Sequence, residues 1–326
     1  MNSDPTSGVP IPAQSGAVTA MLGLVGMVLL FSTIAPATKY VFQTSHVNPN
    51  LLTCARVGIG FLCLLPTALL TDARGLSSLT WSSFLRLTTL GWLGVVSYAV
   101  AAWGLQYTSV SHYILIYSLI PTFTTLFGMA LGRHVAHPVT FIGMGCASLG
   151  CLIAISDSSL FSGFAFTLGD GYALLYTMMM AAHMAWSGGI AKTFGVFTAN
   201  TVMFGSSFLV LLPAAWAGIP SGDEVSYGAY GLICYIGLAT VGAFVLRYWT
   251  LRSLPPATVA TFHNLIPICT IFLAHVTLGE PIGLPLLIGG TTILIGIELV
   301  RKGEKLFPLW AQWWLMVRKA LSGPLS

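Results

Sequence analysis

The sequence predicts an all-α integral membrane protein in which ten transmembrane helices form two inverted five-helix repeats. Three observations lead to this fold class: a strongly apolar composition, a succession of ten apolar runs, and a similarity of the chain to itself after a shift of 146 residues. Of the 326 residues, 56% are hydrophobic and only 7% are charged, whereas soluble proteins carry about 25% charged residues. A soluble core cannot take up so much apolar sequence, so we expect the chain to lie in a lipid bilayer.

The composition also limits the kinds of ligand. The net charge is only +4 and the basic residues are not clustered, which argues against a nucleic-acid partner. The six cysteines lie within apolar runs and lack the spacing of a metal site, so we expect neither disulfides nor a metal, and no cofactor. The sequence contains no phosphate loop, nucleophile elbow or HExxH motif, which argues against an enzyme.

Ten apolar runs approach the length of about 20 residues that a helix needs to cross a bilayer. They cover residues 17–40, 50–70, 82–106, 111–131, 138–156, 169–191, 199–217, 228–251, 257–278 and 282–300. Residues 1–16 are polar and are predicted to form a disordered cytoplasmic tail. Within the C-terminal tail, 303–326, the stretch 305–321 is short and charged. Its tryptophans, flanked by Lys and Arg, favour an interfacial helix.

The distribution of charges predicts the orientation. If the N-terminus lies inside, the inner loops and helix ends hold Arg74, Arg86, Arg133, Lys192, Arg247, Arg252, Arg301, Lys302, Lys305, Arg318 and Lys319. The outer loops then hold acids and no Lys or Arg, with Asp170 and Glu280 at outer helix ends. This is the positive-inside pattern. It predicts that both termini lie in the cytoplasm. We expect a multi-pass membrane protein, of the bacterial inner membrane.

The two halves of the chain align after the shift of 146 residues. Trp103 then meets Trp249, and Leu119-Ile120-Pro121 meets Leu265-Ile266-Pro267. The expected units are a first repeat at 17–156, an outer linker at 157–168 and a second repeat at 169–302. Because each repeat has five spans, an odd number, the second copy enters the membrane from the opposite side. Inverted repeats of this kind are typical of secondary transporters, whose sites lie where the halves meet.

In their order along the chain, these features resemble the drug/metabolite transporter superfamily, in particular its EamA-like members. The resemblance covers about residues 17–302 and rests on the two five-span halves and on Pro121, Pro267, Leu278-Gly279-Glu280, Gly289, Gly290, Gly296, Lys39 and Arg56. It implies a secondary transporter that exports a small polar metabolite, amino acids among the candidates, by alternating access around a central cavity. One departure is that Arg133 stands where the first repeat would offer a counterpart to Glu280, so we expect the two ends to gate differently.

Histidines and aromatic residues are the candidates for the substrate site. No carboxylate falls at the centre of a span, so His183 and His263 are the groups that could relay protons. Span six carries Tyr172, Tyr176, Met179, His183 and Trp186 on one helical face. We expect the site to be lined by Tyr98, Tyr113, Tyr117, Tyr176, Met179, His183, Trp186, His263 and Asn264. The alternative is structural: histidines bonded to neighbouring helices and aromatics in interfacial belts.

Two prolines and two cations complete the candidates. Proline removes a backbone donor and frees the carbonyl four residues back, so Pro121 acts on Tyr117 and Pro267 on His263, and both are predicted helix kinks. Lys39 and Arg56 could attract an anionic substrate or extend to lipid headgroups, and the latter is favoured for Lys39.

Two other functions stay open beside export of a polar metabolite. One is uptake or exchange of an organic anion through Lys39 and Arg56. The other, of a different class, is a membrane enzyme or assembly protein. The expected partners are a small-molecule metabolite, the lipid bilayer and, if the histidines titrate, protons. The chain is expected to act as a monomer or a homodimer.

Overall fold

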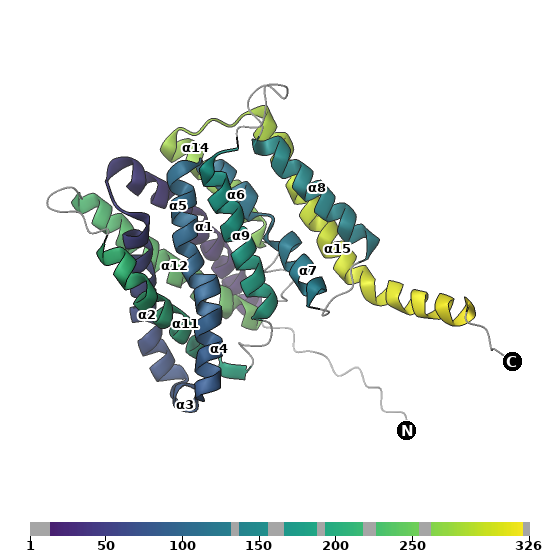
Figure 1. Ribbon diagram of the computed structural model, residues 1–326, viewed down its shortest axis with the longest axis horizontal. Coiled ribbons are helices and arrows are strands. Elements are labelled where there is room, and N and C mark those ends of the chain that lie inside the picture. The colour runs from purple at the N-terminus through teal and green to yellow at the C-terminus, as the bar shows by residue number, and fades with distance from the viewer. Residues whose placement is uncertain are drawn as a thin grey trace.

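The protein is a bundle of helices packed side by side (Figure 1). The computed structural model describes residues 14–131, 137–155, 166–187, 193–217, 226–253 and 262–321. Within these ranges every regular element is helical, and there is no β-strand. The helices are α1 (Gln14–Thr44), α2 (Pro49–Thr71), α3 (Ala73–Ser77), α4 (Trp81–Gly91), the π-helix η1 (Trp92–Val96), α5 (Ser97–Tyr107), α6 (Val110–Tyr117), α7 (Ile120–Ala130), α8 (Pro138–Ile155), α9 (Leu168–Trp186), α11 (Val196–Trp216), α12 (Tyr227–Ser253), α14 (Leu265–Leu278) and α15 (Leu284–Leu321).

These helices match the ten expected spans. Eight helical segments in the described ranges are long and apolar enough to cross a membrane. Among them, the third span consists of α4, η1 and α5 in succession, and the fourth of α6 and α7. The ninth span is α14, which is apolar but shorter, and α9 is the sixth. The predicted fold class is therefore confirmed, and the third and fourth spans are interrupted in ways that the hydropathy of the chain does not reveal.

Helix contacts follow the symmetry of an inverted repeat. The first span of each repeat packs against the third span of the other, so α1 lies along α12 and α9 lies along α5. The second spans of the two repeats, α2 and α11, pack on each other, and so do the fifth, α8 and α15. Such a pattern maps onto itself when the halves are exchanged. The central region therefore receives side chains from both repeats.

Glycines at the α8–α15 contact show the same symmetry at the level of atoms. A Cβ on Gly143 would lie 2.7 Å from the carbonyl oxygen of Gly296, and one on Gly296 would lie 2.7 Å from that of Gly143. Gly150 and Gly289 form the equivalent pair, at 2.7 and 2.5 Å. Because Gly143 and Gly150 correspond to Gly289 and Gly296 under the 146-residue shift, the contact is its own image. Small residues let helix backbones approach closely in lipid, where there is no hydrophobic driving force between helices.

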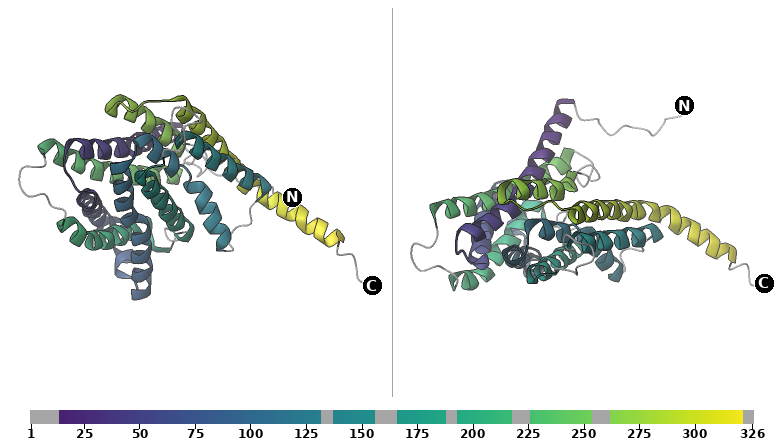
Figure 2. Two further views of the ribbon diagram at one scale, coloured as in Figure 1. Left: turned by 45° about the horizontal axis from the view of Figure 1, so that its top comes forward. Right: turned by 90° about the horizontal axis from the view of Figure 1, so that it is seen from above.

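The last helix extends beyond the predicted tenth span. α15 continues as one helix from Leu284 to Leu321, and it carries the predicted interfacial segment as an extension that projects beyond the bundle (Figure 2). At the other end of the chain, α1 already begins at Gln14, while the rest of the predicted tail lies outside the described residues. Most of the predicted linker, 157–165, and Arg133 also lie outside them.

The α8–α15 contact leads to a stability prediction. Gly143→Val should lower the thermal stability of the detergent-solubilised protein by the equivalent of about 1–3 kcal/mol, the usual cost of overpacking, because the new side chain meets the backbone of α15. Gly145→Val on the same helix is the matched control, since nothing lies within 4 Å of a Cβ at that position. Thermal unfolding followed by size-exclusion chromatography measures both. Equal melting temperatures for the two variants would contradict the packing described here.

Candidate functional site

A central cavity of about 260 Å³ lies between the two repeats. This volume is close to the lower end of the range of about 300–1,000 Å³ found for ligand pockets. Most of the lining residues are apolar or aromatic, and the others are polar or charged side chains such as Arg56, His183 and Asn200. The lining residues include Phe31, Thr38, Arg56, Gly94, Tyr98, Leu105, Tyr113, Tyr117, Tyr176, His183, Asn200, Phe244, Arg247 and His263.

Four tyrosines form one wall of the cavity. The Tyr176 ring, from α9, stacks on the rings of Tyr113 and Tyr117 from α6, with centroids 6.0 and 5.8 Å away and interplanar angles of 12° and 13°. Tyr98 of α5 stands at a tilted angle to Tyr176, at 6.3 Å. The α6 pair is spaced by four residues, which places both rings on one helical face. The wall therefore joins helices of the first repeat to a helix of the second, with apolar ring faces and polar hydroxyl tips.

Arg56 of α2 extends beside this wall. Its guanidinium carbon lies 4.3 Å from the centre of the Tyr98 ring, a cation–π contact. Its Nε donates to Oγ1 of Thr240, on α12, at 2.8 Å. The Thr240 hydroxyl in turn donates a hydrogen bond to the Ile236 carbonyl one turn earlier. These two contacts hold the guanidinium at the cavity wall.

His183 is held by the π-helix. Its Nδ1 lies 2.9 Å from the carbonyl oxygen of Leu90, so Nδ1 is the donor of this bond. The ring packs directly on Gly94 of η1, where a Cβ would come within 2.5 Å of Nδ1. π-helical turns widen the backbone and are frequent at functional sites. The end of α4 thus provides the acceptor, and Gly94 of the π-helix provides the space, that fix this imidazole at the cavity wall.

His263 also lines the cavity, next to aromatic rings. It meets the Phe31 ring of α1 edge-on at 5.9 Å, and Phe31 in turn meets Phe244 of α12 at 5.8 Å. Arg247, one turn beyond Phe244 on α12, also lines the cavity and lies within electrostatic range of His263 and Tyr117.

Three predicted lining residues are not on the cavity wall. Met179, Trp186 and Asn264 are absent from the lining that the described residues form. Trp186 instead stacks on Phe127 of α7 at 6.2 Å and is 41% exposed. The face of α9 that carries Tyr176, His183 and Trp186 lies only partly on the cavity, because α9 also packs against α7.

The predicted proline kinks coincide with interruptions of the helix. α6 ends at Tyr117 and α7 begins at Ile120, with Pro121 in the first turn of the new helix. A proline there costs little, because the first N–H groups of a helix have no partner within it. Pro267 is the third residue of α14, which follows Asn264. Both prolines therefore lie at the start of a new helix close to a cavity residue, and the Tyr117 segment is broken where the sequence predicts a bend.

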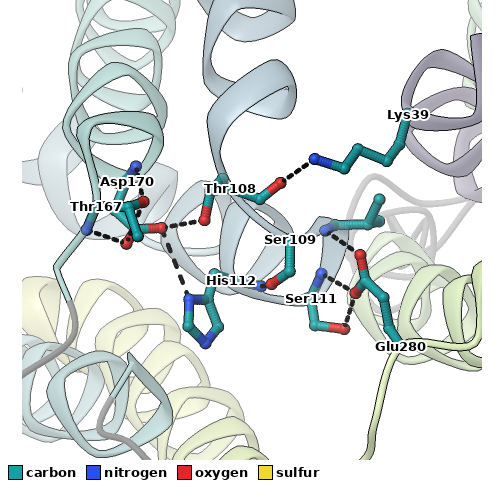
Figure 3. A network of polar contacts seen from close by, with 9 residues as sticks. Lys39, Thr108, Ser109, Ser111, His112, Thr167, Asp170 and Glu280 are labelled. Atoms are coloured by element: carbon teal, nitrogen blue, oxygen red, sulfur yellow. Dashed lines mark hydrogen bonds and ion pairs between the residues drawn. The ribbon is translucent and has the colours of Figure 1, made fainter. Parts of the chain in front are cut away.

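Lys39 lies at the end of the bundle where α5 gives way to α6 (Figure 3). Its Nζ donates to the carbonyl oxygens of Leu105 and Thr108, both at 2.8 Å, and to that of Gln106 at 3.4 Å. These carbonyls close α5, where a cation is favoured by the helix dipole. The ammonium therefore caps a helix, whereas the sequence favours an extension to the headgroups.

Glu280 performs the opposite task for α6. Its carboxylate accepts hydrogen bonds from the backbone N–H groups of Val110 and Ser111, at 2.6 and 3.0 Å, and from the Ser111 hydroxyl at 2.7 Å. An anion is favoured at a helix N-terminus, where the first N–H groups lack partners. Because Glu280 follows α14, a residue of the second repeat stabilises the break between two helices of the first.

Asp170 adds a second acid from the second repeat. This buried side chain closes a capping box with Thr167 at the start of α9 and accepts the Thr108 hydroxyl at 2.5 Å. Nδ1 of His112 lies 3.7 Å from the same carboxylate. We call Lys39, Thr108, Ser111, His112, Asp170 and Glu280 the end network. It connects α1, the α5–α6 break, α9 and the segment after α14 (Figure 3).

Sequence reasoning did not identify Arg247 and Asn200 as cavity residues. Arg247 counts among the inner-end cations under the positive-inside rule, and this rule carries no information on the direction of a side chain. Asn200 is an amide within the apolar run 199–217, and a polar residue inside a span is a signal that could have indicated it. The described residues contain no cluster of three or more His, Cys, Asp or Glu side chains that could hold a metal ion.

Comparisons with known proteins extend over both repeats. Residues 18–156 and 167–301 each match the model of the EamA-like transporter family. An uncharacterized transporter, YdeK, of Bacillus subtilis (strain 168) is 26% identical over 296 residues, which is 87% of this chain and 96% of that protein. An uncharacterized transporter of Archaeoglobus fulgidus is 24% identical over 230 residues, 69% of this chain and 79% of that protein. A solved crystal structure shares the fold, with a TM-score of 0.60 at 17% identity over 88% of this chain and 98% of the other.

Proposed function

The chain belongs to the EamA-like transporter family, and we propose that it exports a small polar metabolite, with amino acids among the candidates, by alternating access around the central cavity. The observation that carries this proposal is the position of the cavity. It lies between the repeats and takes residues from both, as in transporters whose halves move around a fixed site.

The chemistry of the wall suits a small polar molecule. Stacked tyrosine rings provide flat apolar surface with low conformational freedom, and the polar side chains of Arg56, His183 and Asn200 line the same cavity. An amino acid or a similar metabolite combines an apolar body with charged ends. A cavity of about 260 Å³ favours a molecule of this size over a lipid or a large drug.

We propose that the end network closes the cavity at its end of the bundle. Thr38 and Leu105 line the cavity at this end, and their neighbours Lys39 and Gln106 already belong to the network region. The contacts of Asp170 and Glu280 join the second repeat to the first, so they are the contacts that must break when the halves rock apart. In the orientation that the charges predict, this is the outer end, and its opening would release an exported substrate.

Proton coupling, if present, would depend on the cavity histidines. The lining formed by the described residues includes no acidic side chain, whereas His183 and His263 are both present. A His-based exchange predicts efflux that responds to an imposed pH gradient, and facilitated diffusion predicts efflux that ignores it. Replacing His183 with Gln in the same assay distinguishes a proton relay from a histidine that only positions the wall.

Efflux from loaded proteoliposomes tests the proposal. Proteoliposomes with the wild-type protein should release one or more members of a panel of amino acids and small polar metabolites faster than loaded liposomes without protein do. Tyr176→Ala should lower this rate about tenfold, because loss of a stacked aromatic contact costs about 1 kcal/mol beyond the lost surface. Tyr230→Ala, at an exposed position of α12, is the matched control and should keep the wild-type rate. If no panel member crosses in either direction, the proposal is wrong.

A further inference from the structure

Two guanidinium groups line the central cavity, and no acidic side chain of the described residues lines it with them. From this charge balance we infer that the substrate carries net negative charge, as a carboxylate or a phosphate, and that Arg56 binds the charged group. The inference rests on the proposed function, in which the cavity is the transport site, and it names the class of substrate.

The acids that could neutralise the arginines are engaged elsewhere. Asp72 accepts the Thr198 hydroxyl at 2.6 Å, and Glu298 pairs with Arg301 at 3.4 Å. Asp170 and Glu280 are held in the end network. These are the acidic residues whose side chains the structure describes, so within the described part of the chain the cavity cations have no protein counter-charge. A charge within a bilayer is costly unless it is paired, and a bound anion would provide the pairing.

Arg56 is prepared to bind an anion. Its position is fixed by the cation–π contact with the ring of Tyr98 and by the hydrogen bond from Nε to Thr240. A guanidinium has five N–H groups. Among the described residues only the Nε group has a protein acceptor, so both Nη atoms remain available. The two Nη atoms present the planar fork that matches a carboxylate or phosphate.

Arg247 places a second positive charge in the same cavity. It comes from α12, whereas Arg56 comes from α2, and both lie within electrostatic range of the Tyr117 hydroxyl. An anion held against the tyrosine wall is therefore attracted by both arginines. A cationic substrate would be repelled by both arginines, and a neutral one would leave them unpaired.

The first experiment compares probes that differ in charge at nearly constant size. Purified full-length protein in proteoliposomes is assayed for counterflow and efflux of glutamate, succinate and O-phosphoserine, of neutral glutamine and succinamide, and of cationic lysine. The inference expects saturable transport of at least one anion, at a rate about tenfold or more above its neutral analogue. The carboxylate and phosphate probes then identify which anionic group is accepted.

Variants connect the charge preference to Arg56. Arg56→Gln should lower the ratio of glutamate to glutamine transport about tenfold, and Arg56→Lys, which keeps the charge, should restore part of it. Arg86→Gln, an exposed position of α4 outside the cavity, is the matched control and should leave the ratio unchanged. Size-exclusion profiles check that each variant is folded.

The outcomes of these experiments distinguish a failure of the anionic-substrate inference from a failure of the proposed transport function. Preferred transport of glutamine, succinamide or lysine overturns the anionic substrate and leaves the transporter intact. An Arg56→Gln variant whose preference for anions equals that of the wild type overturns the assignment of Arg56 as the group that binds the substrate. Failure of the whole panel, at every charge, counts against the proposed function itself.

Discussion

Replacing Glu280 with Gln should open the end network and raise the exposure of the cavity at that end about tenfold or more. The carboxylate makes three hydrogen bonds at 2.6–3.0 Å, two of them to the first N–H groups of α6. Charge-assisted bonds of this kind are roughly twice as strong as neutral ones, and the favourable interaction with the helix dipole is lost with the charge. A loss of about 2 kcal/mol in one of two states shifts their ratio by roughly thirtyfold.

Thiol labelling measures this shift. A cysteine at Thr38, which is 3% exposed and lines the cavity beside Lys39, reports on opening at this end when the six native cysteines are replaced. A membrane-impermeant maleimide should label this cysteine faster in the Glu280→Gln background. Glu298→Gln, which removes only a surface ion pair with Arg301, should leave labelling and efflux unchanged. Unchanged labelling in the Glu280 variant would show that the network does not close the cavity.

Much of the fold could be predicted from the chain because its signals are local and periodic. Apolar runs identify membrane helices one at a time, and an internal shift of 146 residues identifies the repeat. The glycines of α8 and α15 give part of this repeat a structural reason: Gly143 and its counterpart Gly289, and Gly150 and its counterpart Gly296, each permit a backbone contact that a Cβ would block.

The interruptions of the spans were only partly predictable. Pro121 and Pro267 indicate irregular backbone, and the structure places both at the start of a helix. The π-helix η1 has no comparable signal, because Gly91 and Gly94 look like ordinary small residues in an apolar run. Their roles depend on remote helices: α9 brings His183 against Gly94 from 89 positions along the chain, and α11 brings the backbone of Met203 against Gly91.

The end network could not be predicted because it depends on distances between remote residues. Lys39, Asp170 and Glu280 each lie near a span end, where the sequence favours contact with headgroups or water. In the structure all three converge on the α5–α6 break, and the contact between Val110 and Glu280 spans 170 positions. The same limit affects Arg247: a cation near the end of an apolar helix can face lipid, solvent or a cavity, and hydropathy does not distinguish these directions.

Gly94→Ala should lower efflux about tenfold or more, an effect that depends on His183. The new Cβ would lie 2.5 Å from Nδ1 and 2.7 Å from Cγ of this imidazole, so the ring must leave its place. The ring is fixed to α9 and to the Leu90 carbonyl at 2.9 Å, and its displacement breaks that bond and moves a bulky group into the cavity. A buried carbonyl left without a donor costs about 1–3 kcal/mol, enough to change the geometry of the wall.

A double-mutant cycle separates this mechanism from a general weakening of η1. His183→Ala removes the ring that the added methyl group would meet, so Gly94→Ala should have little further effect in the His183→Ala background. The coupling energy should then fall within the range of about 0.5–3 kcal/mol found for residues in direct contact. Gly145→Ala, where the added methyl group meets open space, controls for the loss of a helical glycine. Additive effects of the two substitutions would mean that Gly94 serves the π-helix itself, and that His183 reaches the cavity wall by another support.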